Sequence, residues 1–206
     1  MYGCNQSSAL KIPADVNLKQ HKNLQTDLVQ ISQLKKLILP GDIITRTGND
    51  FTSQSLKTLN RKDKTFSHCG IASLENDSLF VYHALGGEWN PDQKIKRELF
   101  DLFCSPLNNN MVGVYRFKLL QLQKNRLLQQ AKLFYKSNIL FDLDFDLKTD
   151  DKMYCTEFVY KSILKATDSL LTINHSFIKE FEFIGVDDII HNSLCSKIAV
   201  LNYRLY

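Results

Sequence analysis

The sequence predicts a single domain of the α+β class with a largely antiparallel sheet. Its 206 residues are 44% hydrophobic and 23% charged, which suits one domain with a substantial apolar core. Two β-rich runs, "HCGIASL" and "LFVYHAL", are separated only by the turn residues "ENDS" and predict an antiparallel hairpin. Strand-like and helix-like segments do not alternate regularly, which argues against a doubly wound parallel sheet.

The N-terminal region contains a polar segment followed by the first expected helix. Residues 1–23 are polar and without periodicity, so we expect a flexible tail and then one domain over residues 24–206. From Leu24 to Ile38, apolar residues recur at helical spacing, and Pro40-Gly41 ends this helix.

The remaining elements follow from the same patterns. Runs rich in β-branched and aromatic residues predict strands, helical spacing of apolar residues predicts helices, and Gly, Pro, Asn or dense charge predicts loops. The expected strands cover residues 42–46, 68–74, 79–85, 111–118 and 197–204. Helices are expected within residues 52–65, where a charged loop follows, at residues 122–135 and 153–166, and near residues 176–183, with irregular segments at residues 86–110 and 141–152.

Composition excludes several classes of protein. The net charge of +4 is modest and no arginine-rich run occurs, so we expect no nucleic-acid partner. No apolar run reaches the length of about 18 residues that spans a bilayer, and no signal peptide is present in the chain. The cysteines are odd in number and form no CxxC pair, which argues against a disulfide framework and the usual zinc site. They are Cys4, Cys69, Cys104, Cys155 and Cys195.

Cys4 lies in the segment "MYGCNQSS", which is similar to the junction where bacterial lipoproteins are cut and lipidated. The apolar segment that precedes such a junction is missing here. Two interpretations stay open. Either Cys4 is lipidated and anchors the protein to a membrane of the cell envelope, or the similarity is accidental and the protein is cytoplasmic.

Cys155 is the strongest candidate for chemistry because it begins an expected helix directly after an acidic loop. At a helix N-terminus, free backbone N–H groups and the helix dipole stabilise a thiolate and lower its pKa from about 8.5. The same N–H groups can hold the oxyanion of a tetrahedral intermediate. The alternative is a buried structural cysteine, the commoner fate of a lone cysteine beside an amphipathic helix.

Two histidines are candidates for the partner of this thiol. His68 begins one strand of the expected hairpin and His83 ends the other, so both can lie at one edge of the sheet. On the same face, the second imidazole can orient the first, as a catalytic triad requires. The alternative for His83 is a core histidine, and Cys69 should point away from the site into the core. We expect surface positions for the other histidines, His21, His175 and His191.

Six motifs, in order, resemble the bacterial YiiX-type branch of the permuted papain-like superfamily. They are "GDIITRTG", "SHCGIASL", "VYHA", "VGVYRFK", "LFDLDFD" and "YCTEFVYK". This superfamily is related to NlpC-type peptidoglycan peptidases and to lecithin:retinol acyltransferase. The resemblance implies a circularly permuted papain-like fold in which the histidine strand precedes the cysteine helix.

The resemblance also implies roles for single residues. His68 matches the general base, Cys155 the nucleophile and His83 the third polar position, where many YiiX-type sequences carry Glu and retinol-type acyltransferases carry His. Asp142 either contacts substrate or braces its loop, and a solvated acidic loop is equally open. Tyr154 borders the substrate cleft or helps the oxyanion site, and a packing role is the alternative. The remaining interpretations concern Glu157, expected to cap the helix, and Trp89, which either lines an apolar substrate pocket or belongs to the core.

The expected function is hydrolysis of an amide, in a peptidoglycan stem peptide or an N-acyl amino compound, through a thioacyl-enzyme. Lipid acyl hydrolysis or transfer is one alternative, and a binding module with an inert Cys155 is another. A zinc site would need His68 and Cys69 to reach one metal from opposite faces of a strand, which speaks against it. We expect no metal and no cofactor, and a peptide or acyl substrate as the partner.

Overall fold

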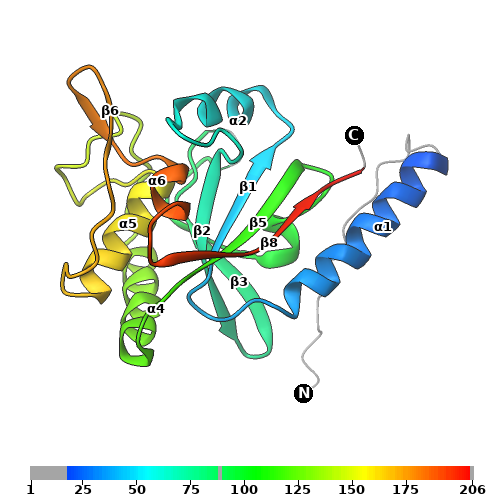
Figure 1. Ribbon diagram of the computed structural model, residues 1–206, viewed down its shortest axis with the longest axis horizontal. Coiled ribbons are helices and arrows are strands. Elements are labelled where there is room, and N and C mark those ends of the chain that lie inside the picture. The colour runs from blue at the N-terminus through cyan, green and yellow to red at the C-terminus, as the bar shows by residue number, and fades with distance from the viewer. Residues whose placement is uncertain (1–17, 88–89, 205–206) are drawn as a thin grey trace.

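The computed structural model describes residues 18–87 and 90–204, and its centre is a six-stranded antiparallel sheet (Figure 1). The order of the strands is β4-β3-β2-β1-β5-β8, and β6 and β7 form a separate hairpin. The strands are β1 (Ile43–Gly48), β2 (His68–Glu75), β3 (Ser78–His83), β4 (Lys96–Leu99), β5 (Asn109–Phe117), β6 (Ser176–Ile178), β7 (Phe181–Phe183) and β8 (Cys195–Asn202). The helices are α1 (Leu18–Lys35), α2 (Phe51–Leu56), the 3-10 helix η1 (Lys57–Leu59), α3 (Phe100–Phe103), α4 (Gln121–Lys136), α5 (Cys155–Ala166) and α6 (Val186–Ile190).

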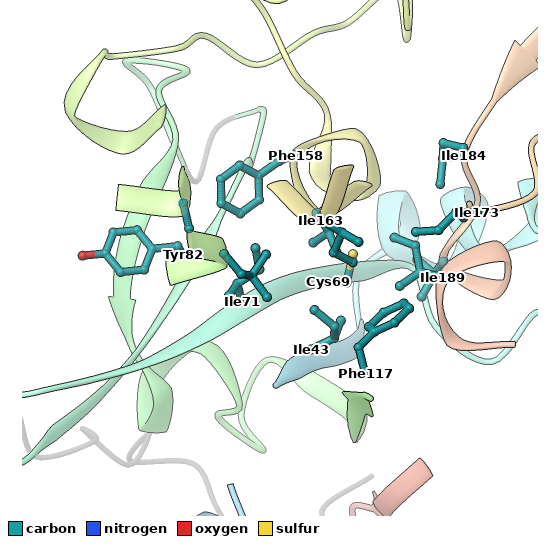
Figure 2. Packing of buried hydrophobic residues seen from close by; sticks show 14 of the residues in the cluster. Ile43, Cys69, Ile71, Tyr82, Phe117, Phe158, Ile163, Ile173, Ile184 and Ile189 are labelled. Carbon is teal, nitrogen blue, oxygen red and sulfur yellow. The ribbon is translucent and has the colours of Figure 1, made fainter. Parts of the chain in front are cut away.

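Helices cover both faces of the sheet, because the central strands carry apolar residues on both sides. On one face, Ile43 and Ile71 pack with Phe158 and Ile163 of α5, as Figure 2 shows, and α4 adds its own apolar side. On the other face, Ile44 and its neighbours pack with α1 and α3. Burial of these two layers is the main favourable contribution to folding.

The predicted hairpin and the two long helices after it are present in the structure. β2 and β3 pair in antiparallel register, with Ile71 opposite Tyr82. Position 70 requires glycine because the neighbouring strand β3 leaves no room for a side chain. A Cβ atom there would lie 2.6 Å from the Tyr82 carbonyl oxygen and 2.9 Å from the Cβ atom of His83. This close approach brings the end of β3 against the start of β2.

Three expectations differ from the structure. α1 begins at Leu18, inside the segment expected to be a tail, and residues 86–110 contain β4 and α3 instead of being irregular throughout. Residues 176–183 form the hairpin β6–β7 instead of a helix, because Lys179, with φ of +56°, reverses the chain between two short runs of alternating residues. Helix α6 was not expected.

None of the helices in the described part of the chain combines the length and the apolar character that crossing a membrane requires.

Candidate active site

Cys155 is the first residue of α5, as the sequence predicts, and the start of this helix is held from several sides. Tyr154 is the N-cap residue, and its backbone N–H donates to Glu157 Oε2 at 3.2 Å, so Glu157 caps the helix. The Tyr154 hydroxyl accepts a hydrogen bond from the backbone N–H of Ile184 at 2.9 Å, and its side chain is buried. Tyr154 thus ties the start of α5 to the segment before α6, and it also contributes to the cavity beside Cys155.

His68 and His83 meet at the edge of the sheet. The Nε2 atom of His68 lies 2.9 Å from the Nδ1 atom of His83, and their rings are nearly perpendicular. Burial lowers the pKa of His68 to about 4 and that of His83 to about 4, so both imidazoles are neutral at pH 7. Because this contact occupies the Nε2 atom of His68, a second partner can bind only at its Nδ1 atom.

That second partner is Cys155. Both residues line one cavity, and their interaction raises the pKa of His68 and lowers that of the Cys155 thiol. The pKa of the Cys155 thiol lies well below its ordinary value, first because of its interaction with Cys69 and then because of His68, although burial acts in the opposite direction. The thiol and the imidazole therefore stabilise each other's charged forms, which favours transfer of a proton between them.

The position of Cys69 corrects one expectation. Cys69 is fully buried in the apolar layer under α5 (Figure 2), as predicted for a core residue, but it does not point away from the site. Its Sγ atom lies 3.8 Å from the backbone oxygen of Cys155, and burial raises the pKa of the Cys69 thiol well above its ordinary value. Because α5 begins over the start of β2, a core side chain of the strand touches the first turn of the helix.

Glu98 and Arg46 join the site without having been identified in the sequence. Glu98 Oε2 lies 3.5 Å from the Nε2 atom of His83. Burial raises the pKa of Glu98, but the interaction with His83 outweighs it and leaves this pKa below its ordinary value. The strand β4 that carries Glu98 was expected to be irregular, because the three charged residues that begin "KREL" show no alternation of apolar and polar residues.

A cavity of about 710 Å³ lies beside these groups, and both Cys155 and His68 line it. Most of its wall is apolar, with side chains from segments far apart in the sequence. They include Leu59, Leu102, Phe141, Leu143, Phe145 and Phe183. The nucleophile candidate is therefore accessible from a space large enough for a small organic substrate.

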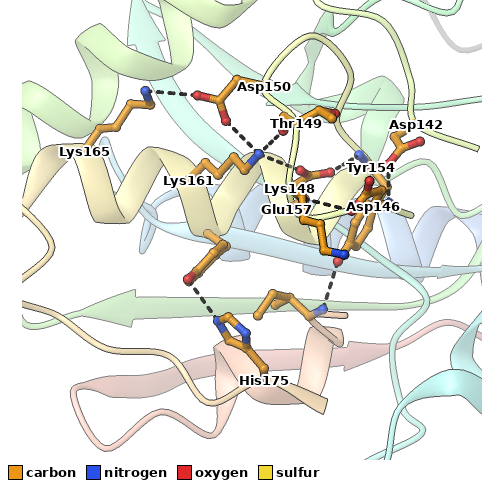
Figure 3. Close-up of polar contacts among 12 residues, drawn as sticks. Asp142, Asp146, Lys148, Thr149, Asp150, Tyr154, Glu157, Lys161, Lys165 and His175 are labelled. Carbon is orange, nitrogen blue, oxygen red and sulfur yellow. Dashed lines mark hydrogen bonds and ion pairs between the residues drawn. The ribbon is translucent and has the colours of Figure 1, made fainter. Parts of the chain in front are cut away.

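Asp142 braces the acidic loop of residues 141–152 (Figure 3). Its two carboxylate oxygens accept hydrogen bonds from the backbone N–H groups of Asp144 at 2.9 Å and Asp146 at 2.6 Å. The residue is buried and is not among those that line the cavity. Of its two expected roles, the structure shows bracing of the loop.

Lys161 attaches the same loop to α5 (Figure 3). Its ammonium group pairs with Glu157 at 2.9 Å and with Asp150 at 2.7 Å, and it donates a hydrogen bond to the backbone oxygen of Thr149. Burial raises the pKa of Glu157 to about 7, although the interaction with Lys161 opposes this shift. The cap of α5 and the loop therefore share one cation.

Two further candidates, Cys4 and Trp89, lie outside the described residues. Lipidation of Cys4 and a place for Trp89 in the substrate pocket stay predictions.

Comparisons with known proteins support the fold. No family model matches the sequence, and no curated protein matches it. Among solved structures, the chain is similar to the metalloprotein YiiX from Escherichia coli O157:H7, DUF1105, at 19% sequence identity and a TM-score of 0.63. The match covers 78% of this chain and 96% of that chain. This similarity confirms a YiiX-like fold, of the α+β class with a mostly antiparallel sheet packed against helices.

Proposed function

We propose that the protein is a cysteine hydrolase of the permuted NlpC-type papain-like superfamily that cleaves an amide bond through a thioacyl-enzyme. A peptidoglycan stem peptide or an N-acyl amino compound is the proposed kind of substrate. One observation carries this proposal: Cys155 at the start of α5 interacts with His68, which His83 orients, beside a cavity that both Cys155 and His68 line.

The mechanism assigns one task to each group. Neutral His68 takes the proton of the Cys155 thiol, and the thiolate attacks the acyl carbon of the amide. Backbone N–H groups in the first turn of α5, which have no partner within the helix, hold the oxyanion. The imidazolium of His68 then protonates the leaving amine, the C–N bond breaks, and water releases the acyl group from sulfur. His83 holds His68 in orientation throughout.

Lipid acyl chemistry is the second candidate, and the apolar wall of the cavity favours it. A lipid ester or thioester would place its chain against Leu102, Phe141 and Leu143, and the same nucleophile would form the same thioacyl-enzyme. Assays with an amide and an ester of the same acyl group distinguish the two candidates.

The residues of this site do not fit a metal ion. Within residues 18–87 and 90–204, no three His, Cys, Asp or Glu side chains are grouped as metal ligands would be. The facing nitrogens of His68 and His83 are 2.9 Å apart and bonded to each other, so they are not both available to a metal. The proposed mechanism uses side chains, backbone N–H groups and water.

The test is alkylation of the folded protein with iodoacetamide from pH 5 to 9, followed by mass spectrometry of each cysteine. We expect Cys155 to react fastest at pH 7, and His68→Ala to slow it by about tenfold or more, because the base is lost. His175→Ala is the matched control, since His175 bonds to Tyr160 and Glu182 instead. Equal rates at Cys155 in the wild type and in His68→Ala would refute the assignment, and an inert Cys155 would favour a binding module.

A further inference from the structure

Arg46 is a charged residue of the cavity that the proposed mechanism does not use. It lies on β1 directly opposite His68 on β2. Directly opposite residues of an antiparallel pair project from the same face of the sheet, so the guanidinium and the imidazole are neighbours. Both side chains line the cavity together with Cys155.

The position of this guanidinium is held by α3. Its Nη1 atom donates a hydrogen bond to the backbone oxygen of Phe103 at 2.9 Å, and its Cζ atom lies 4.3 Å from the centre of the Phe103 ring. The same ring packs against His68 and His83, with ring centres 5.7 Å and 4.9 Å away. One aromatic side chain therefore fixes the cation and both imidazoles relative to one another.

The charge of Arg46 has no ion-pair partner in the part of the chain that the structure describes. The two nearby carboxylates that attract it are engaged elsewhere: Glu98 with His83 and Lys96, and Asp50 with Ser53. Burial lowers the pKa of Arg46 from its ordinary value, the sign of a cation that lacks full compensation. A partly buried guanidinium whose nearby carboxylates are engaged elsewhere is most stable when a ligand supplies an anion.

The shape of the guanidinium selects the kind of anion. Its planar fork offers two parallel N–H donors, which match the two oxygens of a carboxylate. The rest of the cavity wall is mostly apolar, with Leu102, Leu143 and Phe145 among its side chains. The site thus combines a nucleophile for an amide, a cation for a carboxylate and apolar surface for a hydrocarbon group.

We propose that Arg46 binds the carboxylate of the substrate beside Cys155, and that the substrate class is N-acyl amino acids with an apolar acyl group. This inference rests on the proposed function and specifies its substrate. Arg46 is a binding residue that discriminates between a free carboxylate and a neutral end.

Two alkylating reagents test the inference directly at Cys155. Iodoacetate and iodoacetamide undergo the same displacement of iodide by the thiolate, but only iodoacetate carries a carboxylate. We expect Arg46→Met to lower the ratio of the iodoacetate rate to the iodoacetamide rate about tenfold, as loss of one charge-assisted pair implies, and Arg46→Lys to lower it less. Arg126→Met is the matched control, because Arg126 pairs with Asp168 outside this cavity.

A measurement on the wild type keeps the test independent of how the variants fold. Decanoate should protect Cys155 from iodoacetamide at concentrations at which decanamide does not. Hydrolysis of an N-decanoyl amino acid should exceed that of its C-terminal amide, with the difference mainly in KM and reduced in Arg46→Met. Fast, His68-dependent reaction with iodoacetamide combined with an unchanged rate ratio and equal protection would overturn the role of Arg46 alone. A Cys155 inert to both reagents would instead overturn the proposed function.

Discussion

At the scale of single residues, the candidate site is a chain of four groups that ends in a carboxylate. Cys155 interacts with His68, His68 with His83, and His83 with Glu98. Because both imidazoles are buried, forming an imidazolium there is unfavourable unless a negative charge is near. Glu98 supplies that charge at the far end of the chain.

Removal of this charge should slow the chemistry without removing the nucleophile. In Glu98→Gln, the imidazolium of His83, and through it that of His68, loses stabilisation, so the thiolate of Cys155 is less populated. We expect alkylation of Cys155 at pH 7 to slow about two- to tenfold, equivalent to roughly 1 kcal/mol. Glu180→Gln, at an exposed position, should leave the rate unchanged. A rate in Glu98→Gln equal to that of the control would show that Glu98 does not act on the imidazoles.

The residues of the candidate site were not equally easy to identify from the sequence. Three of them lie at the ends of elements that the sequence predicts: Cys155, His68 and His83. Alternation along a strand indicates which side chains share a face of the sheet. Glu98 and Arg46 look like ordinary surface charges in the sequence. Their roles follow from the register of β3 with β4 and of β1 with β2, which local patterns do not contain.

At the scale of elements, Glu75 at the end of β2 connects its own strand to β3, β4 and α4. It accepts hydrogen bonds from Tyr82 at 2.9 Å and Arg97 at 2.9 Å and pairs with Lys132 at 3.0 Å. Burial raises the pKa of Glu75, but these partners, with Ser73, outweigh burial and hold it at about 2. One carboxylate therefore joins three strands to a helix.

This shift predicts how stability depends on pH. A carboxyl group whose pKa is lower in the folded than in the unfolded protein contributes stability above its unfolded pKa, near 4.5, and loses it as the pH falls toward about 2. We expect Glu75→Gln to lower the free energy of unfolding by on the order of 2 kcal/mol at pH 7 and by much less at pH 3. Urea unfolding at both pH values measures this, with Glu180→Gln as the control. A loss of the same size at both pH values would contradict the charge-based explanation.

Other elements show where local patterns mislead. The segment 176–183 has polar residues between aromatic ones and was expected to be a helix, but a two-residue turn at Lys179 makes it a hairpin. The strand β4 has only four residues, and its pairing with β3 stabilises it more than its own sequence indicates.

At the scale of the whole molecule, the cavity is assembled from distant segments that one loop holds in place. Residues 141–152 supply Phe141, Leu143 and Phe145 to the wall, and Leu140 bridges both Lys94 and Lys152 just before the loop. At its other end, the loop is attached to α5 through Lys161. Lys161 therefore helps to hold the loop that supplies this part of the cavity wall.

Replacement of Lys161 should weaken the fold in a pH-dependent way. The pKa of Glu157 is raised to about 7 in the folded protein, so its protonated form stabilises the fold below about 4.5, and this contribution is lost as the pH rises through 7. In Lys161→Met the carboxylate also lacks its cation, so we expect a loss of about 1–3 kcal/mol at pH 8 and a smaller loss at pH 5. Urea unfolding measures the loss, and limited proteolysis should cut within residues 141–152 sooner.

The control for this experiment is Lys165→Met, because Lys165 contacts Asp150 at 3.5 Å from an exposed position. The double variant Glu157→Gln with Lys161→Met should recover part of the stability at pH 8. If Lys161→Met were equally destabilising at pH 5 and pH 8, the effect would come from packing rather than from the buried carboxylate.

The sequence by itself determined the class of the fold, the central hairpin and the positions of Cys155, His68 and His83, because apolar periodicity and helix starts are local properties of the chain. Only the tertiary structure decided that Cys69 supports the thiolate, that Arg46 and Glu98 join the site, and that apolar segments enclose a cavity. These contacts depend on the pairing register of the strands and on the packing of the helices against the sheet. Burial in that packed structure then shifts the pKa values of the side chains at the site.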